Sequence, residues 1–287
     1  MAGVDQIMPT PLSALEPEWC TVGCPRLDDF LQGGLLCRSI TELAGEFASG
    51  KTQFCMQCCL AVQWPVSSGG LNGKAVYICT EGMPAGERIE EMAMEHWRMG
   101  KGAGEGSLDG ILIIEAVCVQ ALWICLNQVA NLVAGGDSQV RLVVIDSIAN
   151  LFREVSDKPS IDELKERANR MFEMSSLLKK MADECNLAVL ITNQVVDVIS
   201  NDGQPSESGM SEVQTSGREV LPSLGLAWAS CINTRLVATR HVNGDVRIRD
   251  LQVAFSPHLN QSRCLYEISK AGLFGIPEAI GVQSNIQ

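Results

Sequence analysis

The segment GEFASGKT, Gly45–Thr52, has the glycine, lysine and threonine spacing of a phosphate-binding loop. Glycines at these positions let main-chain amides surround phosphate oxygens, and a helix that begins here adds partial positive charge. We expect Lys51 to neutralise the β- and γ-phosphates of a nucleotide and the Thr52 hydroxyl to bind Mg²⁺. The alternative, a glycine turn before a surface lysine, fits poorly with an apolar segment before the motif and another after it. The predicted nucleotide-binding residues of this loop are Gly45, Glu46, Phe47, Ala48, Ser49, Gly50, Lys51 and Thr52.

Single polar residues end three of the apolar segments that follow the loop. Asp146 closes LVVID and either holds Mg²⁺ through water or caps a helix; the loop upstream favours the metal role. Glu81 follows AVYICT, and it is equally well explained as the general base that activates water or as an exposed acid in a turn. Gln194 follows LAVLITN, where it either hydrogen-bonds the γ-phosphate or caps the strand.

Strands must alternate with helices to bring these residues together. Apolar runs predict five buried strands at residues 39–44, 75–80, 111–114, 141–146 and 187–192. Helical spacing predicts helices at residues 52–64, 86–98 and 119–134. This order indicates an α/β fold with a doubly wound, mainly parallel sheet. Residues 229–269 read as further strands that extend the sheet in antiparallel fashion, with turns at Asn243–Gly244 and Ser256–Pro257.

A fourth helix is predicted after Ser160, because Ser160 and Glu163 have the spacing of a capping box. Its apolar stripe is interpreted as core; the stripe consists of Leu164, Ala168, Met171, Met174, Leu178, Met181 and Cys185. Residues 101–110 read as a flexible loop, and residues 195–223 are polar without a clear period. We expect one domain at residues 20–275, with short tails at 1–19 and 276–287.

Composition limits the possible functions. The 287 residues carry a formal net charge of −12, which argues against strong, autonomous binding of nucleic acid. No run of about 18 apolar residues is present, so no membrane-spanning helix is expected. Residues 1–17 have the character of neither a signal peptide nor a transit peptide. The 12 cysteines are expected to be reduced, buried, intracellular thiols, and Cys55 and Cys58 lack the second pair that a zinc site needs.

The motifs GEFASGKT, YICTEG, LVVIDS and LITNQV, in this order, resemble the RecA-type recombinase family in its eukaryotic branch. The resemblance runs from about Cys20 to Gly275 and includes the segment Thr21–Leu35 before the loop. Residues 216–236, SGREVLPSLGLAWASCINTRL, are similar to a paralogue of the recombinases rather than to the recombinases themselves.

This resemblance implies a RecA-like ATPase core that uses ATP and Mg²⁺. It assigns catalytic roles to Glu81, Lys51 and Gln194, and metal binding to Thr52 and Asp146. It also implies that Arg88, shortly after YICTEG, stacks on the adenine. Residues 153–160 and 195–222 fall where the family has its two DNA-facing loops. The implied setting is the nucleus, in a hetero-oligomer with other RecA-type paralogues, where single-stranded or branched DNA is bound mainly by the complex and no membrane is involved.

Three departures from the family pattern favour an accessory role. Only about twenty residues stand where the family has a helical DNA-binding domain, and Phe255 replaces the acid that caps ATP across a protomer interface. The second DNA-facing segment has Arg218 as its single base against five acids, which are Asp197, Asp202, Glu207, Glu212 and Glu219. We therefore expect a weak, DNA-dependent ATPase subunit in homologous-recombination repair.

Two other functions remain open at this point. The chain could be an interaction subunit that binds ATP structurally, or a full recombinase, which the acidic segment disfavours. One cluster of bases could still form a DNA groove, but the favoured interpretation is a set of solvated charges at a strand edge; the cluster is Arg235, Arg240, Arg247 and Arg249.

Overall fold

The computed structural model describes residues 16–83, 86–101, 108–135, 139–152, 160–198, 213–243 and 246–277. The helices are α1 Pro25–Phe30, α2 Lys51–Ala61, α3 Gly86–Arg98, α4 Val119–Ala134, α5 Ile148–Leu151, α6 Ile161–Glu184 and α7 Gly225–Ala229. A short 3₁₀ turn, η2, covers Val66–Ser68. The strands are β1 Trp19–Cys20, β2 Leu35–Leu36, β3 Ser39–Gly45, β4 Lys74–Cys79, β5 Ile111–Glu115, β6 Val140–Asp146, β7 Ala188–Asn193, β8 Val195–Asp197, β9 Val213–Thr215, β10 Arg218–Pro222, β11 Thr234–Asn243, β12 Val246–Phe255, β13 Arg263–Ser269 and β14 Gly272–Gly275.

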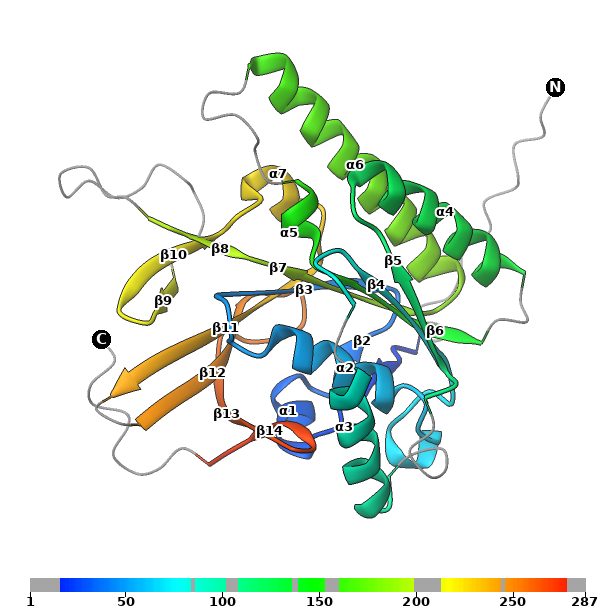
Figure 1. The fold of residues 1–287 in the computed structure, drawn as a ribbon, viewed down its shortest axis with the longest axis vertical. Coiled ribbons are helices and arrows are strands. Elements are labelled where there is room, and N and C mark those ends of the chain that lie inside the picture. The colour runs from blue at the N-terminus through cyan, green and yellow to red at the C-terminus, as the bar shows by residue number, and fades with distance from the viewer. Residues whose placement is uncertain are drawn as a thin grey trace.

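Nine strands form the central sheet, in the order β14-β13-β12-β11-β3-β7-β6-β4-β5. The strands from β11 to β5 pair in parallel, and β11 to β14 pair antiparallel, as the sequence predicts. Helices cover both faces, with α1, α2 and α3 on one side and α4 to α7 on the other (Figure 1). The predicted doubly wound, mainly parallel fold is therefore confirmed.

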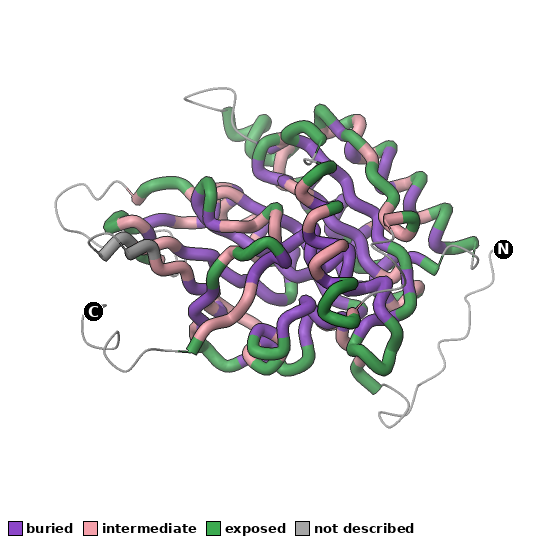
Figure 2. The backbone as a smooth tube through the Cα atoms, turned by 60° about the horizontal axis from the view of Figure 1, so that its bottom comes forward, coloured by how far each residue is buried: buried purple, intermediate pink, exposed green. Residues whose placement is uncertain are grey.

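The core lies on both faces of the parallel strands, because successive residues of a strand point to opposite sides of a sheet. In β6, Leu142 and Val144 pack toward α1 and α2, whereas Val143 and Ile145 pack toward α4 and α6. Figure 2 shows the buried backbone continuing through the middle of the molecule. Strands that are buried on both faces need continuous apolar sequence, which is why β6 and β7 read as unbroken apolar runs.

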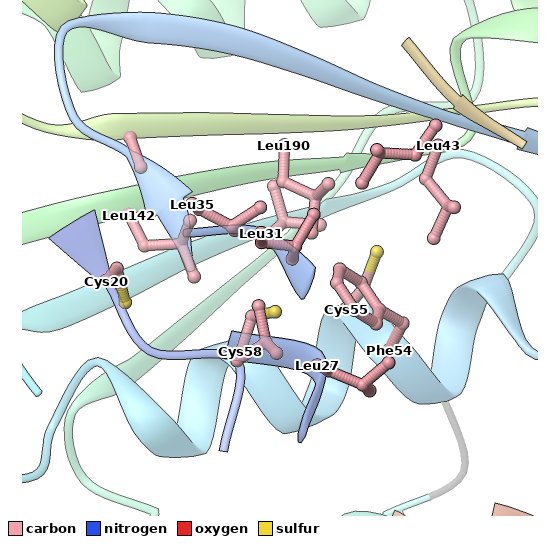
Figure 3. Packing of buried hydrophobic residues seen from close by; sticks show 14 of the residues in the cluster. Cys20, Leu27, Leu31, Leu35, Leu43, Phe54, Cys55, Cys58, Leu142 and Leu190 are labelled. Carbon is pink, nitrogen blue, oxygen red and sulfur yellow. The ribbon is translucent and has the colours of Figure 1, made fainter. Parts of the chain in front are cut away.

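The cluster between the sheet and α2 holds most of the buried cysteines. Cys55 and Cys58 of α2 lie among Leu31, Leu142 and Leu190 in Figure 3. Burial raises the pKa of both thiols well above its ordinary value, so they stay protonated and behave as small apolar side chains. Among the described residues, no group of three or more His, Cys, Asp or Glu could hold a metal ion.

The start of α6 differs from the prediction of a fully buried stripe. The capping box is present, with Ser160 Oγ accepting from the Glu163 amide and the Glu163 carboxylate accepting from the Ser160 amide. Met171, Met174 and Leu178 are buried. Leu164, however, is 41% exposed, because the first turns of α6 project beyond the body of the molecule (Figure 1).

The polar segment after β7 also differs from its prediction, since it contains regular structure. Strands β8, β10 and β9 form a separate antiparallel sheet in that order. The expectation of strands from residue 229 onward is wrong for its first residues, because Ala229 ends α7 and β11 begins at Thr234. Most of the predicted loops at 101–110 and 153–160 lie outside the described residues. No described helix is both long enough and apolar enough to cross a membrane.

Candidate nucleotide-binding site

Four neighbouring parallel strands end at the same edge of the sheet, and each delivers a predicted site residue there. β3 leads into Gly45, β4 is followed by Glu81, β6 ends at Asp146 and β7 is followed by Gln194. Ligands of open α/β sheets bind outside the carboxyl ends of the strands. A cleft of about 1340 Å³ lies at this edge and is lined by residues from all four strand ends.

The glycine loop between β3 and α2 has a geometry that larger residues would not allow. Gly50 has φ +104°, and a Cβ there would meet Ile268 Cδ1 at 3.0 Å. A Cβ on Gly45 would come within 2.5 Å of the Ala238 carbonyl oxygen. The Ser49 hydroxyl is buried and makes no hydrogen bond within the described part of the chain. Helix α2 begins at Lys51, so its free amides face the cleft.

Lys51 lies over this loop. Its Nζ donates to the Gly45 carbonyl at 2.8 Å and to the Glu46 carbonyl at 2.9 Å. Burial lowers the pKa of Lys51, while the carboxylates of Asp146 and Glu81 act in the opposite direction. These carbonyl oxygens are neutral. Phosphate oxygens, which carry negative charge, would therefore bind the Lys51 ammonium more strongly than the carbonyls do.

Asp146 accepts hydrogen bonds from three hydroxyl groups. Thr52 Oγ1 lies 2.8 Å from Oδ2, Tyr77 OH lies 2.5 Å from the same oxygen, and Thr192 Oγ1 lies 2.5 Å from Oδ1. The three donors come from α2, β4 and β7, so the carboxylate is fixed from both neighbouring strands. Burial and the adjacent carboxylate both raise the pKa of Tyr77, which therefore remains a donor.

Glu81 and Gln194 contact each other directly. Gln194 Nε2 donates to Glu81 Oε1 at 2.8 Å, and Ser147 Oγ donates to the same oxygen at 2.6 Å. Ser147 is itself fixed by Thr80, whose hydroxyl donates to the Ser147 carbonyl at 2.6 Å. The predicted base and the predicted phosphate-sensing amide thus share one hydrogen bond beside the glycine loop.

Arg88 lines the cleft from α3. Its guanidinium donates to Gln53 Oε1 at 2.7 Å, to the Ser269 carbonyl at 2.6 Å and to the Lys270 carbonyl at 2.8 Å. It also forms an ion pair with Glu91. These contacts hold the plane of Arg88 next to the β13–β14 turn.

Two other residues of the loop have different surroundings. The Phe47 side chain is 92% exposed. Glu46 is buried and accepts from the hydroxyls of Thr215 at 2.7 Å and Ser216 at 2.6 Å. Burial raises the pKa of Glu46, but these hydrogen bonds, with Arg240 and Arg218 nearby, outweigh it and lower the pKa below its ordinary value.

The interpretation of the arginine cluster as solvated strand-edge charges is wrong for Arg235 and Arg240, and the side chain of Arg247 lies outside the described residues. β11 and β12 are interior strands, and Arg235 on β11 is buried with its Nε bound to the Glu42 carboxylate. Arg240 forms an ion pair with Glu46 at 3.4 Å. Phe255 packs over Arg235, with 5.1 Å between the guanidinium carbon and the ring centroid. The ring at the altered capping position therefore covers a buried ion pair.

The residues at this edge fit a nucleotide with Mg²⁺. A hydroxyl and a carboxylate lie within hydrogen-bonding distance at Thr52 and Asp146, and Mg²⁺ prefers such oxygen ligands. Thr52 and Asp146 would supply two oxygen ligands, and phosphate and water oxygens would complete the coordination. The loop glycines, the α2 N-terminus and Lys51 supply the positive surface that phosphates require.

Sequence reasoning missed Tyr77, Thr192 and Ser147. Each lies within or next to a strand end that carries a predicted residue, and each donates to Asp146 or Glu81. Their residue types gave no signal, since buried threonines and tyrosines are common in strands. The register of the parallel strands is what brings them together: Cys79 pairs with Asp146 across β4 and β6.

Comparison with known proteins gives consistent relatives. Residues 19–276 match the family described as Rad51. The chain is 32% identical to the DNA repair protein XRCC3 homolog of Arabidopsis thaliana over 282 residues, covering 89% of this chain and 92% of that protein. It is 36% identical to the DNA repair protein XRCC3 of Mus musculus over 279 residues, covering 92% and 76%. It is also 31% identical to the DNA repair protein RAD51 homolog 2 of Mus musculus, covering 90% and 76%. The chain belongs to the Rad51 family.

Proposed function

We propose that this chain binds ATP with Mg²⁺ and acts as an accessory subunit in the repair of DNA by homologous recombination. The observation that carries the proposal is the set of contacts at the glycine loop, where Lys51 lies over the loop carbonyls and Thr52 contacts Asp146. A cleft of about 1340 Å³ beside them has room for a nucleotide.

The residues predicted to bind the nucleotide each have a proposed role in the cleft. Lys51 and the loop amides bind the phosphates, Thr52 and Asp146 hold the metal ion, and Arg88 stacks on the adenine. Glu81 accepts the proton of the attacking water, and Gln194 orients Glu81 and senses the γ-phosphate. Bound Mg²⁺ would neutralise charge on the β- and γ-phosphate oxygens.

The biological setting follows from the relatives. Several of them are named DNA repair proteins, and their similarity spans most of this chain. We infer that the chain acts in the nucleus. We also infer that residues 20–275 form one ATPase domain. We further infer hetero-oligomers with other recombinase paralogues, in which the complex supplies most of the surface for single-stranded or branched DNA.

A second candidate is an interaction subunit that binds ATP structurally and hydrolyses it little. Phe255 favours it, because a ring packed over Arg235 offers no carboxylate to a neighbouring protomer's nucleotide. The Glu81–Gln194 contact favours residual hydrolysis instead. The two candidates make the same prediction for binding and differ only in turnover.

Replacing Lys51 with alanine tests the proposal. Titration of a fluorescent ATP analogue in the presence of Mg²⁺ should give an affinity at least about tenfold weaker than that of the wild type, because the positive charge beside the phosphates is lost. Lys179→Ala, an exposed position on α6, is the matched control and should bind as the wild type does. Equal affinities in the Lys51→Ala variant and this control would refute the assignment of the cleft.

A further inference from the structure

Glu46 has two sides that face different parts of the molecule. Its main-chain carbonyl accepts from Lys51 Nζ inside the phosphate-binding loop. Its side chain points to the small β8–β10–β9 sheet, where it meets Thr215, Ser216 and Arg218. One residue of the loop therefore contacts both the phosphate-binding lysine and a second sheet.

Three hydrogen-bond donors and one further ion-pair partner, Arg240, surround the carboxylate of Glu46, whose side chain is only 7% exposed. We call these residues the Glu46 cluster; its members are Glu46, Thr215, Ser216, Arg218 and Arg240. A buried carboxylate must keep such partners, because an unpaired charge away from water is costly. Glu46 can therefore stay buried only while the β9–β10 hairpin is docked against the loop.

Arg218 joins this cluster to the strand that follows Gln194. Its Nη1 lies 2.8 Å and 2.9 Å from the two oxygens of Asp197 on β8, and its Nη2 lies 3.2 Å from Glu46 Oε2. β8 begins directly after Gln194, whose amide donates to Glu81. The small sheet is thus attached to the cleft twice, once through Gln194 and once through Glu46.

The attachment through Glu46 depends on whether Lys51 is bound to the carbonyls of the loop or to phosphate. Lys51 Nζ has three N–H donors and uses two of them on the carbonyls of Gly45 and Glu46, so binding both the β- and the γ-phosphate requires at least one of these contacts to be released. The two carbonyl groups that Lys51 contacts lie on either side of the Glu46 Cα, which carries the side chain of the cluster. A rearrangement there alters the position of the carboxylate, which has little freedom among four partners.

We propose that Glu46 and Arg218 are positioning residues that couple nucleotide binding in the loop to the β9–β10 hairpin. The inference rests on the proposed function, since it requires a nucleotide in the cleft. Coupling between two sites is reciprocal, so a ligand that holds the hairpin would also tighten nucleotide binding. Gln194 is joined to the same small sheet through β8, so its contact with Glu81 is a second connection between the cleft and this sheet.

Hydrogen exchange of residues 213–222 measures the coupling. Saturation with a fluorescent, non-hydrolysable ATP analogue and Mg²⁺ should slow exchange there at least about fivefold in the wild type, within the usual range of coupling between sites. Glu46→Gln and Arg218→Gln should bind the analogue at saturation and lose this slowing. Arg218→Gln changes a side chain that is 51% exposed, so it tests the coupling even if Glu46→Gln does not fold.

Arg170→Gln is the matched control, because Arg170 is 50% exposed and pairs with Glu166 on α6. It should retain the full effect of the nucleotide. Slowing that persists in both cluster variants would overturn the inference, and so would a wild type that binds the analogue without any change in exchange. Fluorescence in the same samples reports binding, so a chain that binds no analogue contradicts the proposed function and the coupling together.

Discussion

Asp146 shows how single residues at this site depend on their neighbours. Its two oxygens accept from Thr52, Tyr77 and Thr192, so the carboxylate cannot rotate without losing a hydrogen bond. Thr52 is the one donor of the three that the sequence assigns to metal binding. Tyr77 and Thr192 therefore hold the carboxylate in place, and we expect a bound metal ion to replace only the Thr52 contact.

Replacing Tyr77 with phenylalanine should weaken the response to metal. A hydrogen bond to a charged group contributes on the order of 1.5 kcal/mol, so half-maximal nucleotide binding should need about tenfold more Mg²⁺. Tyr266→Phe is the matched control, because Tyr266 is the chain's other tyrosine and donates to the Ser49 carbonyl at 2.5 Å. That variant should change nucleotide affinity and leave the Mg²⁺ requirement as it is. The same Mg²⁺ requirement in the Tyr77→Phe variant and the wild type would show that Tyr77 does not position Asp146.

Glu81→Gln separates catalysis from binding. The amide keeps the shape of the side chain but cannot accept a proton, so ATP hydrolysis should slow by about 10²–10⁴-fold while ATP binding stays near that of the wild type. Phosphate release and analogue titration measure the two properties. Glu173→Gln on the exposed side of α6 should alter neither. Hydrolysis at the wild-type rate in Glu81→Gln would mean that Glu81 is only a turn residue.

At the scale of elements, the sequence was most informative where a strand is buried on both faces. β4, β6 and β7 are mostly apolar runs that end at or just before a polar residue, and β3 leads into the glycine loop, so both the sheet and its ligand-binding edge could be predicted. The β8–β10–β9 sheet could not be predicted, because two of its strands have three residues each and no periodic pattern fits in such a length.

The arginines show a second limit of sequence reasoning. Arg235 reads as a solvated charge because its partner, Glu42, is 193 residues away in the chain. Charge along a sequence does not indicate which carboxylates the fold will bring near it. Only the parallel pairing of β11 with β3, which places Arg235 opposite Glu42, makes the pair predictable.

Two leucines of α6 test the account of this helix. Leu178 is fully buried between α6 and the sheet, so Leu178→Ala should lower the free energy of unfolding by about 2–5 kcal/mol. Leu164→Ala, the same substitution on the projecting first turns, should change it by less than about 0.5 kcal/mol. Urea denaturation measures both. Equal losses of unfolding free energy in the two variants would contradict this account, because they would mean that Leu164 is as buried in the isolated chain as Leu178 is.

At the scale of the whole molecule, the charge balance bears on whether the chain can bind DNA by itself. The formal net charge is −12, and three of the arginines pair with carboxylates of the chain itself. Arg218 pairs with Asp197 and Glu46, Arg235 with Glu42, and Arg240 with Glu46. Electrostatic binding of DNA requires Lys and Arg that displace counterions from phosphates. Arginines that pair with the chain's own carboxylates contribute little to such binding. This supports the proposal that the chain acts inside a complex.

Binding of single-stranded DNA across a range of salt concentrations tests this central claim most directly. The isolated chain, with saturating ATP analogue, should bind weakly and with a shallow salt dependence, since each neutralised phosphate adds only about 0.7 to the slope. Addition of a recombinase paralogue that supplies basic surface should tighten the binding and steepen the slope. Tight binding by the isolated chain with a steep slope would contradict the account, because it would require a basic surface that the chain possesses by itself.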